Sequence, residues 1–350
     1  MSQKIITGIS SFGMSGKVFH APLLSVHPNF QLKTVVERSK NEVKSIYPDI
    51  KRAGTFEELL KDEEIELIVI NTPDHTHFEF ALKALDAGKN VVVEKPFTQS
   101  ISEGEKLINF ADKKNLLLSV FHNRRWDGDF LTVKKIIENK LLGRLVEFES
   151  HYDRFRNYIQ PNTWKEMPEN GTGTLYNLGS HMIDQALTLF GMPEAVQADI
   201  RILRTDGKID DCYELKLYYR DIKVALKGSY LVREPGPRYL LNGTNGSFLK
   251  YGIDPQEDAL KGSVIPGSTA WGTEPNANWG ILNTELNGLH YTGKVETIPG
   301  NYLAFYDDIF KAITIKTSPY VTAFEALNVI RIIEAAIESN KSKRAIELTK

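Results

Sequence analysis

The chain has 350 residues, of which 41% are hydrophobic and 25% charged, as is usual for a soluble globular protein. Its 43 basic and 45 acidic residues give a formal net charge of -2, which offers no attraction for nucleic acid or an anionic membrane, so neither is expected as a partner. The single cysteine, Cys212, excludes a disulfide within one chain. Because no signal peptide and no apolar run of membrane-spanning length is visible, we expect a cytoplasmic protein.

The first 121 residues alternate short apolar runs with helix-like segments. The apolar runs predict strands at Lys4–Ser10, Leu32–Val36, Ile65–Asn71, Asn90–Glu94 and Leu116–Phe121, with a short one near Ala53. This alternation is typical of a doubly wound parallel sheet. We therefore expect an α/β domain of the Rossmann type at residues 1–121.

Helix starts between these strands carry recognisable capping residues. Thr55–Glu58 and Ser102–Glu105 both match the spacing of a capping box, in which a hydroxyl and a carboxylate accept hydrogen bonds from the first N–H groups of a helix. Asp74 is a candidate cap for a helix over Thr76–Ala87, and Gly88 is placed to end that helix.

A glycine-containing turn, Ser11–Gly16, follows the first predicted strand. A dinucleotide fingerprint would read G-x-G-x-x-G here: Gly13 permits close approach of phosphate and Gly16 permits close packing of helix on strand, whereas Ser11 replaces the first glycine. The cofactor-binding residues expected in this turn are Phe12, Gly13, Met14 and Ser15. A purely structural turn is the alternative.

The second predicted strand ends at Glu37, Arg38 and Ser39. An acidic residue in this position usually accepts hydrogen bonds from the adenosine ribose hydroxyls of NAD, whereas Arg38 and Ser39 are suited to the 2′-phosphate of NADP. Glu37 would repel that phosphate unless its side chain turned away. The expected cofactor is therefore NAD or NADP, with the preference left open.

Glu94, Lys95 and Pro96 follow the valine run Val91–Val93. Three valines in succession indicate a strand buried on both faces, and ligands of open α/β sheets bind beyond the carboxyl ends of the strands. A carboxylate and an ammonium in this position are therefore suited to chemistry, although a solvated strand end is the plainer interpretation of these residues taken alone.

From about residue 145 the sequence alternates apolar and polar residues instead. Strands are predicted at Leu145–Tyr152, Ala195–Arg204, Asp210–Tyr219, Lys223–Leu231, Arg238–Asn242 and Gly246–Lys250. They predict an α+β domain at residues 122–350 with a large, mostly antiparallel open sheet, covered by helices on one face. The free face favours self-association as a homodimer or homotetramer. A loop-rich stretch covers Asp254–Asn278, and a final helix, Ala323–Ser339, is able to pack back on the first domain.

A second cluster of polar residues lies within Gly171–Asp184, where a glycine-rich approach leads into a predicted helix. Asn177, His181 and Asp184 are spaced by four and three residues and so share one face, apart from the apolar stripe. A lone histidine on a helix is usually structural. Combined with Lys95 at a strand tip, however, this stripe favours a catalytic site.

Three motifs together resemble the Gfo/Idh/MocA family, whose members oxidise or reduce sugars and cyclitols with nicotinamide cofactors. The motifs are Gly13-x-x-Gly16 with Phe19-His20-Ala21-Pro22, then Glu94-Lys95-Pro96, then Leu178-Gly179-x-His181-x-x-Asp184. Three further segments resemble the NADP-dependent scyllo-inositol dehydrogenase branch, and these are His122–Trp126, Gly179–His181 and Lys250–Asp258. The resemblance runs nearly end to end.

The resemblance implies a two-domain NAD(P)-dependent dehydrogenase with the nicotinamide ring held at the domain interface beside Lys95. Lys95 would polarise the reacting hydroxyl and His181 would take its proton, because an alcohol losing hydride needs a base and a cation near the developing alkoxide. Glu94 would position Lys95 and the cofactor. Further cofactor contacts are implied for Thr72, Pro73, His75, His77 and Asn123.

Family members commonly carry Asp four residues before the histidine, where this chain has Asn177. An asparagine hydrogen-bonds substrate but cannot accept a proton, so the implied catalytic set is Lys95, His181 and Asn177. The substrate-binding residues implied by the resemblance are Tyr152, Arg154, Trp164, Asn177 and His181, with Arg156 and Asn157 in the same cluster. No carboxylate or cysteine lies at ligand spacing from His75 and His77, so no metal is expected.

The expected activity is hydride transfer between a nicotinamide cofactor and a secondary hydroxyl or ketone of a cyclitol or sugar, as in inositol dehydrogenases. Two alternatives remain at this point. Asn177 leaves open a non-catalytic sensor that binds dinucleotide, and some relatives in the family use tightly bound NAD to cleave glycosides.

Overall fold

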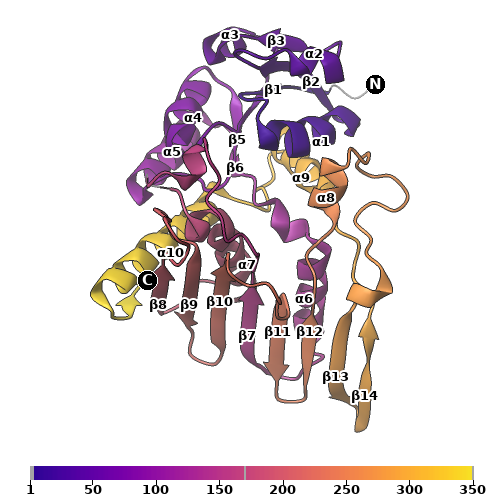
Figure 1. Cartoon of the computed structure of the whole chain (residues 1–350). Helices are drawn as coiled ribbons and strands as arrows, with labels where there is room; N and C mark the ends of the chain where they lie inside the picture. Colours follow the sequence, from indigo (N-terminus) through magenta and orange to yellow (C-terminus); the bar gives the residue numbers. More distant parts are fainter. Residues whose placement is uncertain (1–3, 169–170, 349–350) are drawn as a thin grey trace. The chain divides into compact units, whose positions relative to one another are not determined.

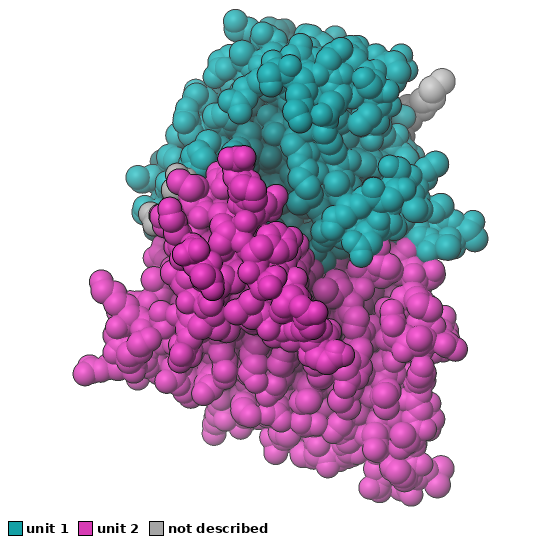
Figure 2. Space-filling view, in the orientation of Figure 1, with its two compact units in different colours: residues 1–126, 256–271, 301–327 teal, residues 127–255, 272–300, 328–350 magenta. Residues whose placement is uncertain are grey.

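The computed structural model describes residues 4–168 and 171–348, which form two compact units (Figure 2). The first unit runs to Trp126 and takes in Gln256–Trp271 and Asn301–Leu327, and the remaining segments form the second unit. The two units are therefore not separated by one boundary between residues 121 and 122, as the sequence predicted, because later segments belong to the first unit. Two later segments return to the first unit because their apolar residues, such as Phe305 and Tyr306, are buried there.

A six-stranded parallel sheet lies at the centre of the first unit (Figure 1). In the order β3-β2-β1-β4-β5-β6, its members are β3 (Lys51–Ala53), β2 (Phe30–Val36), β1 (Ile5–Ile9), β4 (Leu67–Ile70), β5 (Asn90–Val93) and β6 (Leu118–Val120). Every residue of β4 and Val91–Val93 of β5 are buried, which accounts for their uninterrupted apolar sequence. The strand order reverses between β1 and β4, where doubly wound sheets bind their ligands.

Short helices connect these strands and complete the unit. They are α1 (Ala21–Val26), α2 (Glu42–Ile46), α3 (Phe56–Leu60), α4 (His77–Asp86), α5 (Ile101–Lys114), α8 (Gln256–Lys261) and α9 (Leu303–Thr314), with single turns η1 (Gly16–His20), η2 (Asp74–Thr76) and η3 (Asn123–Trp126). The doubly wound parallel sheet predicted for this part of the chain is confirmed.

The helix caps agree with the sequence prediction at one site and differ at another. Thr55 Oγ1 accepts a hydrogen bond from the Glu58 N–H at 3.2 Å, as predicted. In α5 the cap is Ser100, whose Oγ accepts from the Glu103 N–H at 3.4 Å. The box predicted at Ser102–Glu105 is therefore wrong by two residues, because the chain is already helical at Ile101.

A nine-stranded sheet forms the second unit (Figure 1). In the order β14-β13-β12-β11-β7-β10-β9-β8-β15, its members are β14 (Leu289–Val295), β13 (Gly280–Leu286), β12 (Gly246–Lys250), β11 (Tyr239–Gly243), β7 (Leu145–His151), β10 (Lys223–Ser229), β9 (Cys212–Tyr218), β8 (Ala195–Arg201) and β15 (Ile346–Glu347). Within the described part of this sheet, only the β7–β10 pair is parallel. The predicted open, mostly antiparallel sheet is confirmed.

The two faces of this sheet have different side chains. Along β9, Tyr213, Leu215 and Leu217 are buried, whereas Lys216 and Tyr218 on the other face are exposed. The buried face packs against helices. The helices of this unit are α6 (Gly128–Glu138), α7 (Ser180–Phe190) and, from Asn328 on, α10 (Ala323–Ser342). The unit also contains the turns η4 (Trp164–Glu166), η5 (Leu175–Gly179) and η6 (Asn276–Asn278).

The hairpin of β13 and β14 lies in a region for which no strand was predicted. Its register pairs Leu286 with Leu289, so the connection has two residues, Asn287 and Gly288, both with positive φ. Asn-Gly between alternating segments is the strongest short-range hairpin signal because a type I′ turn needs that backbone conformation. The signal was present in the sequence and was missed.

Candidate functional site

Gly16, the first residue of η1, shapes the turn after β1. A Cβ on Gly16 would lie 2.2 Å from the Ser11 carbonyl oxygen, which no side chain tolerates. A Cβ on Gly13 would meet only Ser11 Oγ, at 3.5 Å, among its described neighbours. The turn is therefore tightly packed at Gly16 and open at Gly13, and this arrangement fits the pyrophosphate of a dinucleotide.

Asn71, at the end of β4, ties this turn to the next loop. Its Nδ2 donates to the Ser11 carbonyl at 2.8 Å, and its N–H donates to Ser10 Oγ at 3.0 Å. The predicted cofactor residues Thr72 and Pro73 follow it directly and so lie at the same edge of the sheet. In the turn, Phe12 is buried with its ring edge-on to Tyr47, and Met14 is 53% exposed.

Glu37, at the end of β2, is turned inward. Its two carboxylate oxygens accept hydrogen bonds from the Glu42 and Val43 N–H groups at 3.0 and 3.2 Å, so the side chain caps α2 and is only 7% exposed. Arg38 and Ser39 are exposed. In the sequence, Glu37 indicated NAD whereas Arg38 and Ser39 indicated NADP. In the structure, the Glu37 carboxylate is hydrogen-bonded to the start of α2, and the Arg38 side chain beside it is exposed.

Glu94, after β5, sits in a buried hydrogen-bond chain. One carboxylate oxygen contacts His20 Nε2 at 3.0 Å and the other accepts from the Lys95 N–H at 3.1 Å, while His20 Nδ1 lies 2.7 Å from the Tyr306 hydroxyl. Burial raises the pKa of Glu94, but the hydrogen bond to His20 and the charges of His20, Lys95 and His77 outweigh it and hold that pKa below its usual value. Glu94 is therefore an anion next to Lys95.

The two histidines predicted to bind cofactor differ in their surroundings. His75, in η2, is exposed and accessible to a ligand. His77, the first residue of α4, is fully buried, with Nδ1 2.8 Å from the Pro96 carbonyl and Nε2 3.0 Å from the Thr72 carbonyl. Both ring nitrogens thus contact the protein backbone, and the structure does not support direct cofactor contact by this ring. Asn123, in η3, is 4% exposed.

In the second unit, the candidate catalytic side chains lie on one continuous helical segment. Asn177 belongs to η5, a π-helical turn, and His181 to the α-helix α7 that continues from it. Single π-helical turns inside helices occur frequently at functional sites. His181 is 5% exposed and Asp184 is 2% exposed, while Asn177 is half-buried.

The start of this segment is fixed by Asp210, which precedes β9. Its Oδ2 accepts hydrogen bonds from Thr174 Oγ1 at 2.9 Å and from the Leu175 N–H at 2.8 Å. Gly173 has φ +98°, and a Cβ there would overlap the Asp210 carboxylate. Burial raises the pKa of Asp210, although the hydrogen bonds from Leu175 and Thr174 oppose that rise. Asp210 therefore caps the helix that carries His181.

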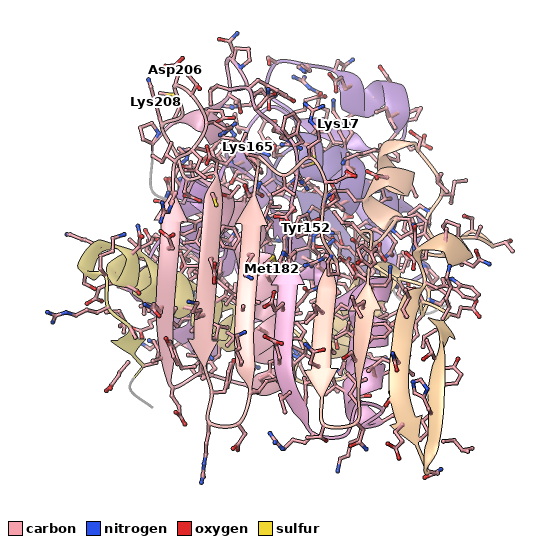
Figure 3. All side chains as sticks on the ribbon, turned by 60° about the horizontal axis from the view of Figure 1, so that its bottom comes forward. Lys17, Tyr152, Lys165, Met182, Asp206 and Lys208 are labelled. Carbon is pink, nitrogen blue, oxygen red and sulfur yellow. The ribbon has the colours of Figure 1, made fainter. Side chains whose placement is uncertain are left out.

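Three of the predicted substrate-binding residues, Tyr152, Arg154 and Trp164, follow β7 in the chain. Tyr152, labelled in Figure 3, is 1% exposed, and the guanidinium groups of Arg238 and Arg154 lie 4.8 and 5.3 Å from the centre of its ring. Trp164, in η4, is half-buried, with Lys165 Nζ 5.9 Å from its ring. Arg154 and Trp164 are therefore accessible to a substrate, whereas Tyr152 is a buried platform for Arg154.

Sequence reasoning missed two residues that support these side chains, Tyr306 and Asp210. His20 stood in a quoted motif, Phe19-His20-Ala21-Pro22, without an assigned role. Nothing in the sequence around Tyr306 or Asp210 indicates which distant atoms they contact, since their partners lie 286 and 35 residues away.

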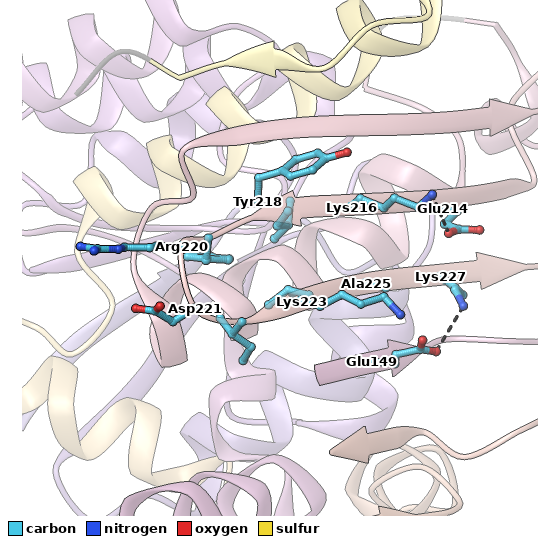
Figure 4. Close-up of a pocket in the computed structure, with 13 residues that line it drawn as sticks. Glu149, Glu214, Lys216, Tyr218, Arg220, Asp221, Lys223, Ala225 and Lys227 are labelled. Carbon is cyan, nitrogen blue, oxygen red and sulfur yellow. Dashed lines mark hydrogen bonds and ion pairs between the residues drawn. The ribbon is translucent and has the colours of Figure 1, made fainter. Parts of the chain in front are cut away.

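The pocket shown in Figure 4 lies elsewhere, at the β9–β10 hairpin and the adjacent part of β7. Lys227 and Glu149 pair across it at 3.2 Å, and charged side chains of the uncovered sheet face surround them. None of the predicted catalytic residues lines it. Among the residues described, no group of three His, Cys, Asp or Glu could hold a metal ion, and no helix has the length and apolar character required to cross a membrane.

The sequence matches the NAD-binding Rossmann domain of the Gfo/Idh/MocA oxidoreductases over residues 5–122 and their C-terminal alpha/beta domain over residues 134–348. It is 43% identical to scyllo-inositol 2-dehydrogenase (NADP(+)) IolW of Bacillus subtilis, over 98% of this chain and 96% of the relative. The oxidoreductase YdgJ of Escherichia coli is 38% identical, with 99% of both chains covered. A crystal structure of a Bacteroides fragilis protein superposes with a TM-score of 0.92 at 50% identity, covering 99% of this chain and all of that one.

Proposed function

We propose that this chain, which belongs to the Gfo/Idh/MocA family of oxidoreductases, is an NADP-dependent dehydrogenase that oxidises a secondary hydroxyl of a cyclitol or sugar, or reduces the matching ketone. The observation that carries the proposal is the presence of Lys95 at the tip of β5, beside a buried anion, together with His181 on α7. The cyclitol class rests on the 43% identity to an inositol dehydrogenase.

Each side chain has a role that follows from its chemistry. Lys95 polarises the reacting hydroxyl and stabilises the alkoxide as it forms. His181 accepts the hydroxyl proton, and Asn177 hydrogen-bonds the substrate without taking part in proton transfer. When bound, the nicotinamide cofactor supplies the hydride acceptor. Glu94 accepts a hydrogen bond from the Lys95 N–H and remains ionised, so a negative charge lies beside the lysine.

Preference for NADP is supported by the inward orientation of Glu37. Because its carboxylate caps α2, no acidic group is presented to a 2′-phosphate at this position, and the exposed Arg38 and Ser39 are available to bind it. We propose that these two residues hold the phosphate.

Two further proposals concern the molecule as a whole. The uncovered face of the nine-stranded sheet is the surface through which we propose that copies of the chain form a dimer or tetramer. The single cysteine is free and half-buried, which is compatible with the reducing cytoplasm that we propose as its location.

The test is a set of initial rates of reduced-nicotinamide formation with a panel of inositols and aldoses, measured with NAD and NADP in parallel. The proposal predicts turnover with at least one inositol and a higher kcat/KM with NADP. Cofactor binding without turnover of any substrate would favour the dinucleotide-dependent sensor, and release of sugar from a glycoside by enzyme with co-purified NAD would favour the glycosidase.

A further inference from the structure

His77 is fully buried, and both nitrogens of its ring face oxygen atoms that can only accept hydrogen bonds. Nδ1 lies 2.8 Å from the Pro96 carbonyl and Nε2 lies 3.0 Å from the Thr72 carbonyl. These distances are normal for N–H···O hydrogen bonds. Thr72 follows β4 and Pro96 follows β5, so the ring bridges two neighbouring loops at the carboxyl edge of the first sheet.

Only the doubly protonated form of the ring satisfies this geometry. A neutral imidazole carries one N–H donor and one bare nitrogen that accepts, so it would place a lone pair against one of the two carbonyl oxygens. Buried polar groups left without a partner are costly, and here the unpaired group would also be repelled. An imidazolium donates to both carbonyls.

His20, in the same unit, shows the opposite arrangement. Its Nε2 contacts the Glu94 carboxylate, which accepts, but its Nδ1 contacts the Tyr306 hydroxyl, which can donate. Burial raises the pKa of Tyr306 well above its usual value, and the charge of Glu94 adds to this, so the hydroxyl keeps its proton. One proton is therefore enough for His20, whereas His77 requires two.

A buried cation needs compensation, and the charged groups nearby supply it. His77 is the first residue of α4, and the amino end of a helix disfavours positive charge. The two carbonyl dipoles and the Glu94 anion oppose that effect. Asp74 in η2 and Glu79 in the first turn of α4 are further acidic residues nearby in the chain, and Lys95 follows Glu94. Burial raises the pKa of Glu94, but His20, Lys95 and His77 together lower it by more, so the net shift is downward.

We infer that His77 is a buried imidazolium that clamps the Thr72 carbonyl to the Pro96 carbonyl and thereby positions the two cofactor-binding loops and Lys95. His77 is a positioning residue, because it acts through backbone groups and not on the substrate. The charge state rests on geometry alone, and its effect on turnover rests on the proposed function.

The charge state is tested by histidine ring 15N–1H correlation spectra of the full chain, recorded at about pH 7.5, where an ordinary histidine is neutral. The His77 signals are assigned by their absence from His77→Gln or, should that variant not fold, by elimination with glutamine variants of the other histidines. The inference predicts that both ring nitrogens of His77 carry protons. A spectrum with one protonated ring nitrogen would overturn it.

The positioning role is tested by binding of NADPH and by turnover in His77→Gln, whose amide can donate to one carbonyl but presents an oxygen to the other. We expect a weaker NADPH affinity by about tenfold and a lower kcat, with KM for substrate little changed. His290→Gln, an exposed position in β14, is the matched control and should behave as wild type. Wild-type affinity and kcat in His77→Gln would overturn the clamp. Absence of turnover in the wild type would count against the proposed function, and the spectra and NADPH affinity would still decide the clamp.

Discussion

At the scale of single residues, Glu37 shows how a side chain's orientation changes the meaning of a motif. An acidic residue at the end of the second strand normally indicates NAD. Here the carboxylate accepts two backbone hydrogen bonds at the start of α2, and Arg38 and Ser39 beside it are exposed. The sequence could not decide between these roles, because the residue type does not determine which hydrogen-bond donors surround the carboxylate.

Replacement of Arg38 by alanine tests this account of cofactor preference. A charge-assisted hydrogen bond to phosphate contributes about 2 kcal/mol, so we expect kcat/KM with NADP to fall about 30-fold while the value with NAD changes little. Lys44→Ala, an exposed basic residue of α2, is the control. An equal loss with both cofactors would show that Arg38 does not bind the 2′-phosphate.

At the scale of elements, strands were predicted well where burial imposes a simple pattern. For β4, β5, β9 and β10, both predicted ends lie within two residues of the observed ends. These strands were predictable because period-two alternation and valine runs follow directly from burial. Neither the α9 helix nor the β13–β14 hairpin was predicted; both lie between the predicted loop, which ends at Asn278, and the predicted final helix. The site depends on contacts such as Asp210 with Thr174, which arise from tertiary packing that no local pattern encodes.

The cap on the His181 helix provides a prediction at this scale. Asp210→Ala removes two hydrogen bonds at a buried helix start, so we expect unfolding free energy to fall by about 2 kcal/mol and kcat to fall as the helix loses its fixed position. Asp210→Asn keeps an acceptor oxygen and should lose less of both. Chemical denaturation and steady-state kinetics measure these effects, and equal losses in the two variants would contradict the capping role.

The uncovered sheet face carries a titratable group, His151, near Asp153 and Glu149 at 3.5 and 3.2 Å. The hydrogen bond to Asp153 raises the pKa of His151, with burial opposing and Glu149 assisting. A raised histidine pKa gives stability that is present below about pH 6.5 and is lost as pH rises through the folded-state value.

We therefore expect His151→Gln to be less stable than wild type at about pH 6 by less than about 1 kcal/mol, and the difference to shrink by about pH 8. Denaturant unfolding of both proteins at several pH values measures this. Burial raises the pKa of Glu149, but the hydrogen bonds from His151 and Lys227 outweigh it and lower that pKa. Its contribution to stability is therefore complete above about pH 4.3 and is lost only as pH falls further, so it stays constant between about pH 6 and 8. A difference that stays constant with pH would contradict the assignment.

At the scale of the whole molecule, the proposed catalytic residues come from both compact units. Lys95 follows β5 in the first, and His181 lies on α7 in the second, 86 residues later by their numbers. The chain also returns to the first unit twice, which supplies Tyr306 to the buried chain of hydrogen bonds behind Glu94. The proposed catalytic set therefore draws on residues of both units, and neither unit carries all of them.

The most direct test of the central claim is the turnover of Lys95→Met and His181→Ala with NADP and the best inositol, alongside NADPH affinity. Loss of a polarising cation or of a general base should lower kcat by about 100-fold or more, while His181→Ala keeps wild-type cofactor affinity. That result would support hydride transfer assisted by these two side chains. Unimpaired turnover in both variants would contradict it.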